Sequence, residues 1–277
     1  MGLMMKNVKT LALAATAVAA MSAPTFAADR GEDIHAGDYN WMQFNYMYAV
    51  DELPGGSSHD YLEMEFGGRS GVVDLYGYLD VFNPSERSDS DKSGSPKMFL
   101  KFAPRFSLDA ITGMDLSAGP IQEVYLSTLF NWGGGDINLY GPGAGDVNNA
   151  SIGFGADVMV PWFGKVSMNL YKYYEIKDKD WNGYQFSMNW FKPFINFDNG
   201  SFISYQGYLD YQFGSDSDYS ETQASSGGVM FNGLYWHSDQ FALGYGLKAF
   251  SDVYLIKDSD GFKSTGFAHY FSATYKF

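Results

Sequence analysis

The side chains best suited to chemistry recur at every second position of several short segments. Within 60–82, tyrosines and carboxylates alternate with apolar residues, and Lys101 and Arg105 hold equivalent positions near residue 100. Tyrosine rings can stack on a flat ligand, carboxylates accept hydrogen bonds from hydroxyl groups, and Lys and Arg donate them. The sequence therefore predicts a polar, ring-lined surface that binds solutes. The candidate residues are Tyr61, Glu63, Glu65, Asp74, Tyr76, Tyr78, Asp80, Lys101, Arg105, Glu123, Tyr125 and Tyr171.

Catalysis is not indicated, because a nucleophile needs a base beside it. His35 precedes the first regular segment, and His59 falls in a connection. His237 lies at a predicted turn, and His269 takes the opposite alternation to the polar residues of its segment. Aspartates surrounded by water are poor acids and bases. We therefore expect no enzymatic activity, no catalytic residues and no cofactor.

Aspartate pairs in three predicted loops are the best candidates for metal ligands, because Ca²⁺ and Mg²⁺ prefer carboxylate oxygens. Asp258-Ser259-Asp260-Gly261 has the start of a calcium-loop pattern but lacks the distal Glu. Solvated loops are the simpler interpretation. The chain also has no cysteine for a thiolate site or a disulfide. We predict no metal site. The pairs are Asp89 and Asp91, Asp216 and Asp218, and Asp258 and Asp260.

Segments of about ten residues with period-2 alternation position these side chains, and none shows a helical period. Their connections are alternately long and short. Lipid offers the backbone no hydrogen-bond partner, so a membrane sheet must close on itself. Residues 28–277 are therefore predicted to form one all-β domain, a transmembrane antiparallel up-and-down β-barrel of about twelve strands with short periplasmic turns and longer extracellular loops. The predicted strands are 39–50, 60–68, 71–82, 98–109, 121–132, 151–160, 164–175, 182–192, 201–213, 228–237, 240–252 and one reaching residue 277.

The final strand favours the barrel over its alternative, a secreted soluble β-sandwich, which would show the same alternation. Aromatic side chains repeat on one face up to Phe277, and aromatic residues make up 18% of the chain. This excess suits the aromatic belts of a membrane barrel. The ending resembles the terminal signal of bacterial outer-membrane barrels, so we expect the barrel-assembly machinery to recognise Phe277.

The first 27 residues (1–27) have the pattern of a secretory signal peptide. Lys6 and Lys9 precede a short apolar run over 11–20, and Thr25-Phe26-Ala27 is a small-x-small cleavage site. Loss of the two lysines would take the net charge from −14 to −16. So acidic a protein repels nucleic acid, which is therefore excluded as a partner. The predicted location is the outer membrane of a Gram-negative cell.

Several blocks resemble the Tsx/OmpK family of nucleoside-specific outer-membrane channels, most closely the vibrio OmpK type. They occur in family order over about a third of the mature chain. The blocks are Tyr61-Leu62-Glu63-Met64-Glu65, Asp74-Leu75-Tyr76-Gly77-Tyr78-Leu79-Asp80, Pro104-Arg105-Phe106-Ser107-Leu108-Asp109, Asp115-Leu116-Ser117-Ala118-Gly119-Pro120, Glu123 with Tyr125, Ser167-Met168-Asn169, Asp180-Trp181-Asn182-Gly183-Tyr184 and Ser264-Thr265-Gly266.

The resemblance implies a monomeric barrel through which nucleosides diffuse passively between weak binding sites. The expected partners are nucleosides, outer-membrane lipid and lipopolysaccharide, with bacteriophages as a further partner of the loops. Other interpretations stay open. Lys101 and Arg105 also suit a ladder of ion pairs that braces the wall, and the tyrosines suit packing or a membrane girdle. The alternative function is a general small-solute pore, or a surface protein that acts mainly through its loops.

Overall fold

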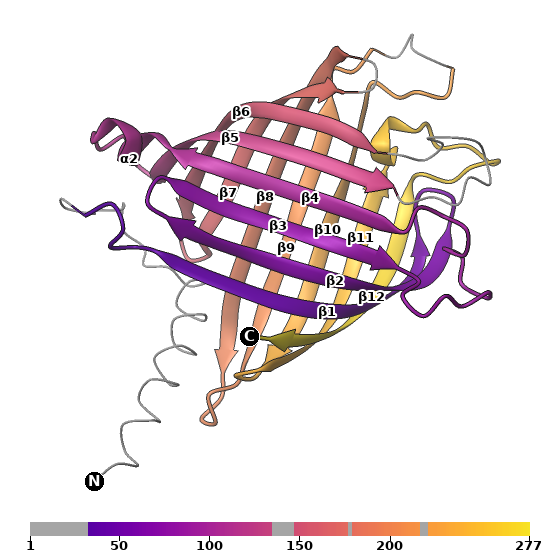
Figure 1. Ribbon diagram of the computed structural model, residues 1–277, viewed down its shortest axis with the longest axis horizontal. Helices are drawn as coiled ribbons and strands as arrows, with labels where there is room; N and C mark the ends of the chain where they lie inside the picture. The colour runs from indigo at the N-terminus through magenta and orange to yellow at the C-terminus, as the bar shows by residue number, and fades with distance from the viewer. Residues whose placement is uncertain (1–32, 135–146, 177–178, 217–220) are drawn as a thin grey trace.

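A closed barrel forms in the computed structural model, which describes residues 33–134, 147–176, 179–216 and 221–277. Each strand pairs antiparallel with its sequence neighbours, and β1 pairs with β12 to complete the ring (Figure 1). The predicted fold class is thus confirmed. The twelve strands in the described residues are β1 (Tyr39–Glu52), β2 (Ser57–Ser70), β3 (Val73–Phe82), β4 (Met98–Ser107), β5 (Ile121–Gly134), β6 (Asn148–Val160), β7 (Gly164–Glu175), β8 (Asp180–Asn196), β9 (Phe202–Phe213), β10 (Ser226–His237), β11 (Phe241–Ser251) and β12 (Gly266–Lys276).

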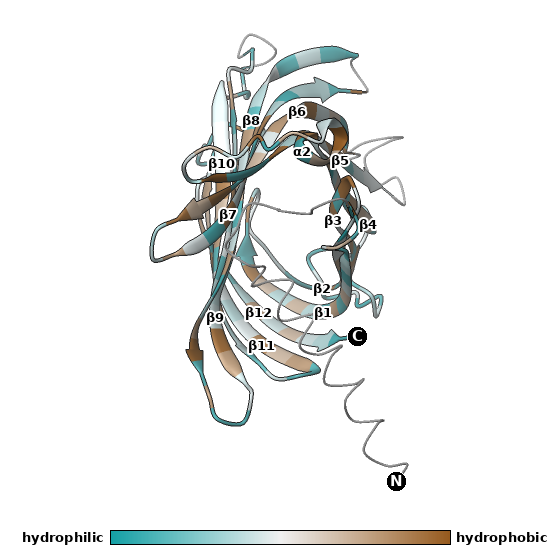
Figure 2. Cartoon of the chain, turned by 90° about the vertical axis from the view of Figure 1, so that its left-hand side faces the viewer, coloured by the Kyte–Doolittle hydropathy of each residue, from teal (hydrophilic) through white to brown (hydrophobic). Residues whose placement is uncertain are grey.

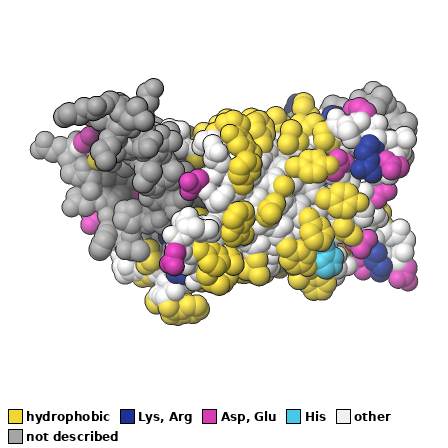
Figure 3. Space-filling model, turned by 90° about the horizontal axis from the view of Figure 1, so that it is seen from below, with side chains coloured by type: hydrophobic (Ala, Val, Ile, Leu, Met, Phe, Trp, Pro, Cys, Tyr) yellow, Lys and Arg dark blue, Asp and Glu magenta, His cyan; other side chains and the backbone are white. Residues whose placement is uncertain are grey.

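The alternation of the sequence becomes an outer and an inner face. On β12, Phe267 and Phe271 are exposed on the outside, whereas Ala268 and Tyr270 are buried inside. Figure 2 looks along the barrel from the side of the chain ends, and hydrophobic and hydrophilic residues alternate along its strands. On the face in Figure 3, apolar side chains gather across the middle and charged ones at an end. An apolar band of this kind suits contact with lipid.

The last residues of the chain complete the ring. Register pairs on β1 and β12 run from Gln43 with Lys276 to Val50 with His269. The Phe277 backbone N–H donates to the Met42 carbonyl at 3.2 Å, beyond the last register pair. No strand edge therefore remains open in the described sheet.

Two connections differ from the prediction. The predicted strand 98–109 stops at Ser107, which caps the short helix α2 (Leu108–Thr112) by accepting a hydrogen bond from the Ala110 N–H. The helix ends at Gly113 in the left-handed conformation. Ser and Gly are common at these two positions, but the strand-like alternation masked the signal. A helix of five residues is too short to show a helical period in the sequence.

The first connection is also shorter than predicted. Residues 51–59 were assigned to a loop, yet β1 runs to Glu52 and β2 begins at Ser57. A register shift between Ala49 and Glu52 marks a bulge, with Asp51 at a φ of 58°. A bulge adds one residue to one strand and reverses the alternation beyond it. Period-2 alternation therefore did not show that β1 continues to Glu52.

Two predictions concern residues that the structure does not describe. These are the predicted signal peptide, residues 1–27, and the loop aspartate Asp218. Within the described residues, no helix has the length and apolarity to cross a membrane. Strand β10 turns Phe231, Tyr235 and His237 inward.

The inner wall is closely packed at Gly246, because the ring of Phe231 occupies the space that a Cβ atom would need. Replacing Gly246 with Val should lower the free energy of unfolding by about 1–3 kcal/mol, because extra atoms would force this ring aside. Urea unfolding in lipid vesicles, followed by Trp fluorescence, measures the change. Gly261→Val is the control, since a Cβ at Gly261 meets nothing within 4 Å. Equal stability of the two variants would contradict this account of the wall.

Candidate functional site

All the candidate side chains lie on the inner face of the barrel. Register pairs such as Asp74 with Arg105 and Glu63 with Asp80 place them on one side of neighbouring strands. We call the end of the barrel at Tyr39 and Lys276 the termini end and the opposite end the loop end. The candidates nearest the termini end are Asp74, Arg105, Glu123 and Tyr125, and those at mid-height or toward the loop end are Tyr61, Glu63, Glu65, Tyr76, Tyr78, Asp80, Lys101 and Tyr171.

The residues near the termini end form a set of buried ion pairs that we call the arginine network. The Arg105 guanidinium lies 2.8 Å from Asp74 and 3.0 Å from Asp157. Arg69 contacts both carboxylate oxygens of Glu123, at 2.9 and 2.8 Å. The predicted ladder is confirmed for Asp74 with Arg105. Glu123, however, pairs with Arg69, which was missed because residue 69 falls between the predicted strands 60–68 and 71–82.

Tyr125 lies at the centre of the arginine network and is only 1% exposed. Its hydroxyl donates to Glu123 at 2.7 Å, and Arg105 lies 4.0 Å above its ring. Lys165 adds a further pair with Asp157 at 3.2 Å. Buried charges are tolerated when they are paired in this way. The network therefore braces the wall and leaves Tyr125 little surface for a solute.

Lys101 makes an ion pair that crosses the interior. Its Nζ lies 2.9 Å from Asp210 on β9, a strand that is not a neighbour of β4. Figure 2 shows β4 and β9 on opposite sides of the opening. Asp210 also accepts a hydrogen bond from Ser187 at 2.5 Å. We call the Lys101–Asp210 pair the cross-lumen bridge, and it narrows the path along the barrel. Alternation indicated that both residues face inward but gave no sign that they pair.

Carboxylates of β2 and β3 form an acidic stretch of the inner wall. Glu65 accepts from the Gln43 amide at 2.6 Å and from the Tyr76 hydroxyl at 2.8 Å. Glu63 accepts from Asn45 at 2.6 Å and stands opposite Asp80 in the register. The buried Oδ1 of Asp80 has no hydrogen-bond partner among the described residues. Tyr76 and the amides of β1 therefore hold the carboxylates of Glu63 and Glu65 in place on the wall.

The predicted tyrosines divide into accessible and packed rings. Tyr76 is 36% exposed and meets Tyr78 edge-on, with centroids 6.2 Å apart. Trp41, predicted to face inward but not included among the candidates, lies 6.3 Å from Tyr76. Three predicted rings are almost fully buried and do not contact the water of the interior: Tyr61, Tyr125 and Tyr171. The accessible rings that were predicted thus reduce to Tyr76 and Tyr78.

Glu52 contacts side chains of several strands at the loop end, although it was not among the candidates predicted from the sequence. It accepts a hydrogen bond from the Tyr270 hydroxyl at 2.6 Å and lies 3.1 Å from His59. Lys248, whose Nζ is 3.5 Å away, also lies 5.1 Å above the Tyr270 ring. The bulge before Glu52 turns its side chain inward, and no period-2 pattern reveals such a reversal.

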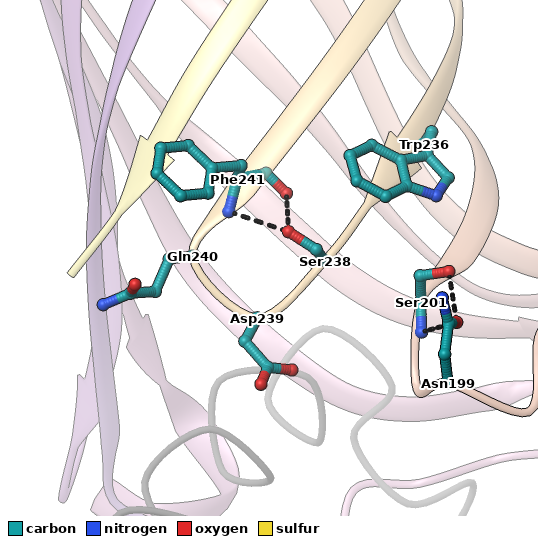
Figure 4. Close-up of a pocket in the computed structure, with 7 residues that line it drawn as sticks. All are labelled: Asn199, Ser201, Trp236, Ser238, Asp239, Gln240 and Phe241. Atoms are coloured by element: carbon teal, nitrogen blue, oxygen red, sulfur yellow. Dashed lines mark hydrogen bonds between the residues drawn. The ribbon is translucent and has the colours of Figure 1, made fainter.

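A small recess lies outside this interior, between the β8–β9 and β10–β11 turns (Figure 4). Its volume is ≈260 Å³, and none of the candidate residues lines it. Its polar groups already bond within their own turns, as Ser201 does with Asn199 and Phe241 with Ser238. The recess therefore contributes no chemistry to the interior surface.

The acidic loops are held by local contacts. Asp89 pairs with Arg87 at 3.0 Å, and Asp258 accepts from the backbone N–H groups of Ser264 and Thr265 at 2.8 and 3.0 Å. Within the described residues, no group of three or more His, Asp or Glu side chains could hold a metal ion. These carboxylates therefore bond to groups of their own loops.

A closed barrel with an apolar outer band and a charged, tyrosine-containing interior defines the class as a channel barrel of the bacterial outer membrane. More specifically, the chain belongs to the Tsx family of nucleoside-specific channel-forming proteins, whose sequence profile matches residues 36–277. The resemblance found in the sequence is thereby confirmed.

Individual relatives agree with this assignment. The outer membrane protein OmpK of Vibrio parahaemolyticus is 64% identical over 266 residues, which cover 96% of this chain and 98% of the relative. The nucleoside-specific channel-forming protein Tsx of Klebsiella aerogenes is 30% identical over 304 residues, or 97% and 99% of the two chains. Among solved structures, a NanC porin has a TM-score of 0.49 at 6% identity, over 85% of this chain and 98% of the porin.

The arginine network yields a prediction about stability. Arg69→Met leaves the Glu123 carboxylate buried without its main partner, so we expect the free energy of unfolding to fall by about 3–5 kcal/mol. Removing both charges, in Arg69→Met with Glu123→Gln, should restore much of this loss. Arg87→Met, in an exposed pair, is the control and should leave stability unchanged. The reading is urea unfolding of the folded barrel, and a single-variant loss no larger than the control's would argue against the network.

Asp258 yields a prediction about pH. Hydrogen bonds from the Ser264 and Thr265 N–H groups lower the pKa of Asp258 below its ordinary value of 3.8. The carboxylate therefore stabilises the loop fully above that value, and this contribution is lost as the pH falls through the lowered pKa. Amide exchange at these two N–H groups, corrected for intrinsic rates, should lose protection on acidification. In Asp258→Asn, protection should not depend on pH, and identical profiles for both proteins would contradict the assignment.

Proposed function

We propose that the barrel interior lets nucleosides diffuse passively across the outer membrane. The observation that carries the proposal is the accessible pair of rings, Tyr76 and Tyr78, beside the carboxylates of Glu63 and Glu65 and across the register from Lys101. Membership of a family described as nucleoside-specific, and the name of the Klebsiella relative, support it.

The chemistry of this stretch matches the chemistry of a nucleoside. A nucleoside is neutral and has an aromatic face, hydroxyl groups and polar base edges. Tyr76 and Tyr78 offer stacking surfaces, Glu63 and Glu65 offer acceptors for hydroxyls, and Lys101 offers a donor. Stacking of a base on an aromatic side chain is worth about 1–3 kcal/mol. Such weak sites suit a channel, because a tight site would hold the solute.

The remaining candidates take a supporting role in this proposal. Asp74, Arg105 and Glu123 hold one another in the arginine network, and Tyr125 packs among them. Tyr61 packs beside His59 and Phe82, which removes it from the path. Tyr171 is buried in the wall. Contact with the solute is proposed for the accessible group only.

The proposal extends to location and partners. Residues 1–27 direct export, and the barrel lies in contact with outer-membrane lipid and lipopolysaccharide as a monomer. The assembly machinery recognises the strand that ends in Phe277, and bacteriophages attach to the loops. As the family consists of channels, we expect no enzymatic activity.

The test of the proposed function compares two solutes of similar polarity. Tyr76→Leu with Tyr78→Leu should lower the flux of adenosine several-fold more than that of glucose, because only the nucleoside has a face to stack. Swelling of proteoliposomes measures both fluxes. Tyr211→Leu is the control, since this ring is exposed on the outside of β9. An equal loss for both solutes would show that the tyrosines set only the width of the path.

A further inference from the structure

The connection between β11 and β12 folds into the mouth of the barrel. The 3-10 turn η2 (Val253–Leu255) buries Val253, which is 2% exposed, and Leu255, which is 6% exposed. Val253 belongs to an apolar cluster on the inner wall. The other buried members are Met47, Ala49, Leu53, Tyr61, Phe231, Tyr235, Phe250, Ala268 and Tyr270. We call η2 the inner turn, because it packs on the inside of the barrel.

The inner turn is held from two sides. The Leu255 carbonyl accepts from the Ala224 N–H at 2.8 Å, which ties the turn to the β9–β10 connection. The Val253 N–H donates to the Ser264 carbonyl at 3.2 Å, within its own connection. Asp258 adds its bonds to Ser264 and Thr265. The turn is thus a fixed part of the wall.

Backbone conformation in the inner turn is unusual. Tyr254 has a φ of 58° and Leu255 a φ of 60°, and Asp252 just before them has a φ of 41°. Side chains other than Gly rarely adopt this left-handed region, and such strain gathers at functional sites. Burial of Val253 and Leu255 holds the conformation, and its effect is to point Tyr254 away from the apolar cluster.

Tyr254 is the exposed residue between these two buried ones, with 66% of its surface accessible. The pKa of Tyr254 is raised to about 12, mainly because the surrounding protein disfavours the charged phenolate, and Glu52 and Tyr208 raise it further, whereas Lys248 lowers it. Lys101 also lowers it. Because Val253 packs in the apolar cluster on the inner wall and the next ring is accessible, Tyr254 extends from the inner turn toward the water-filled interior.

We propose that Tyr254 is a specificity-determining residue of this channel, whose ring projects from the inner turn, narrows the solute path and stacks on passing nucleobases. The wall supplies Tyr208 beside the cross-lumen bridge, since Lys101 lies 5.7 Å and Lys248 6.0 Å from its ring. The inner turn thus adds a ring from the loop end to the rings of the wall. The stacking role rests on the proposed nucleoside function, whereas the narrowing does not.

The experiment uses two substitutions at one position. Tyr254→Gly removes the ring and suits the left-handed backbone, so the barrel should fold at least as well as before. Tyr254→Phe keeps the ring. Asp260→Ala, in the same connection but fully exposed, is the matched control. Heat-modifiable mobility on gels confirms that each barrel is folded.

Single-channel recordings in planar bilayers provide two readings, the conductance in KCl and the adenosine concentration that halves it. We expect Tyr254→Gly to raise the KCl conductance and to weaken adenosine block about tenfold. Tyr254→Phe and Asp260→Ala should behave like the unmodified channel. An unchanged conductance and block in Tyr254→Gly would overturn the proposal.

The two readings also separate this inference from the proposed function. If adenosine does not block the unmodified channel, the nucleoside function and the stacking role both fail. A higher KCl conductance of Tyr254→Gly in that case would still support Tyr254 as the narrowing residue. If adenosine blocks the unmodified channel and Tyr254→Gly equally well, the nucleoside function stands and the stacking role of Tyr254 is refuted.

Discussion

The absence of hydrogen-bond partners in lipid is the constraint on which this structure depends. Every backbone N–H and C=O group at membrane depth must pair with a neighbouring strand, so the sheet closes and has no edge. The contact between β1 and β12 is the step that meets this requirement, and it extends to the Phe277 N–H. Closure then fixes which half of the side chains faces lipid and which half faces the interior.

A closed ring also brings together residues that are far apart in the sequence. Ions confined inside it must be paired, because isolated buried charges are costly. Arg69 with Glu123 and Lys101 with Asp210 join strands that share no backbone hydrogen bonds. The interior is therefore braced across its width. Such bracing leaves a narrow path and fixes the positions of the rings beside it.

A sequence pattern can predict only those features of the molecule that depend on residues close together in the chain. Period-2 alternation is local, so it located the strands and the inward positions of Glu63, Asp74 and Arg105. It failed where the backbone departs from regular pleating, at the bulge before Glu52 and at the helix after Ser107. It also carried no information on partners across the barrel, such as Asp210 for Lys101, because those depend on closure.

The two ends of the interior differ in how many of their polar groups and rings are already engaged by the protein. Near the termini end, the charges of the arginine network satisfy one another, and Tyr125 is closed in among them. Tyr76, in the first half of β3, and Tyr254, at the loop end, are accessible. A solute gains binding energy only from groups that are not already saturated by the protein. In the proposed function, selection therefore belongs to mid-height and the loop end, and the network supplies the rigidity of the wall that carries the selecting rings.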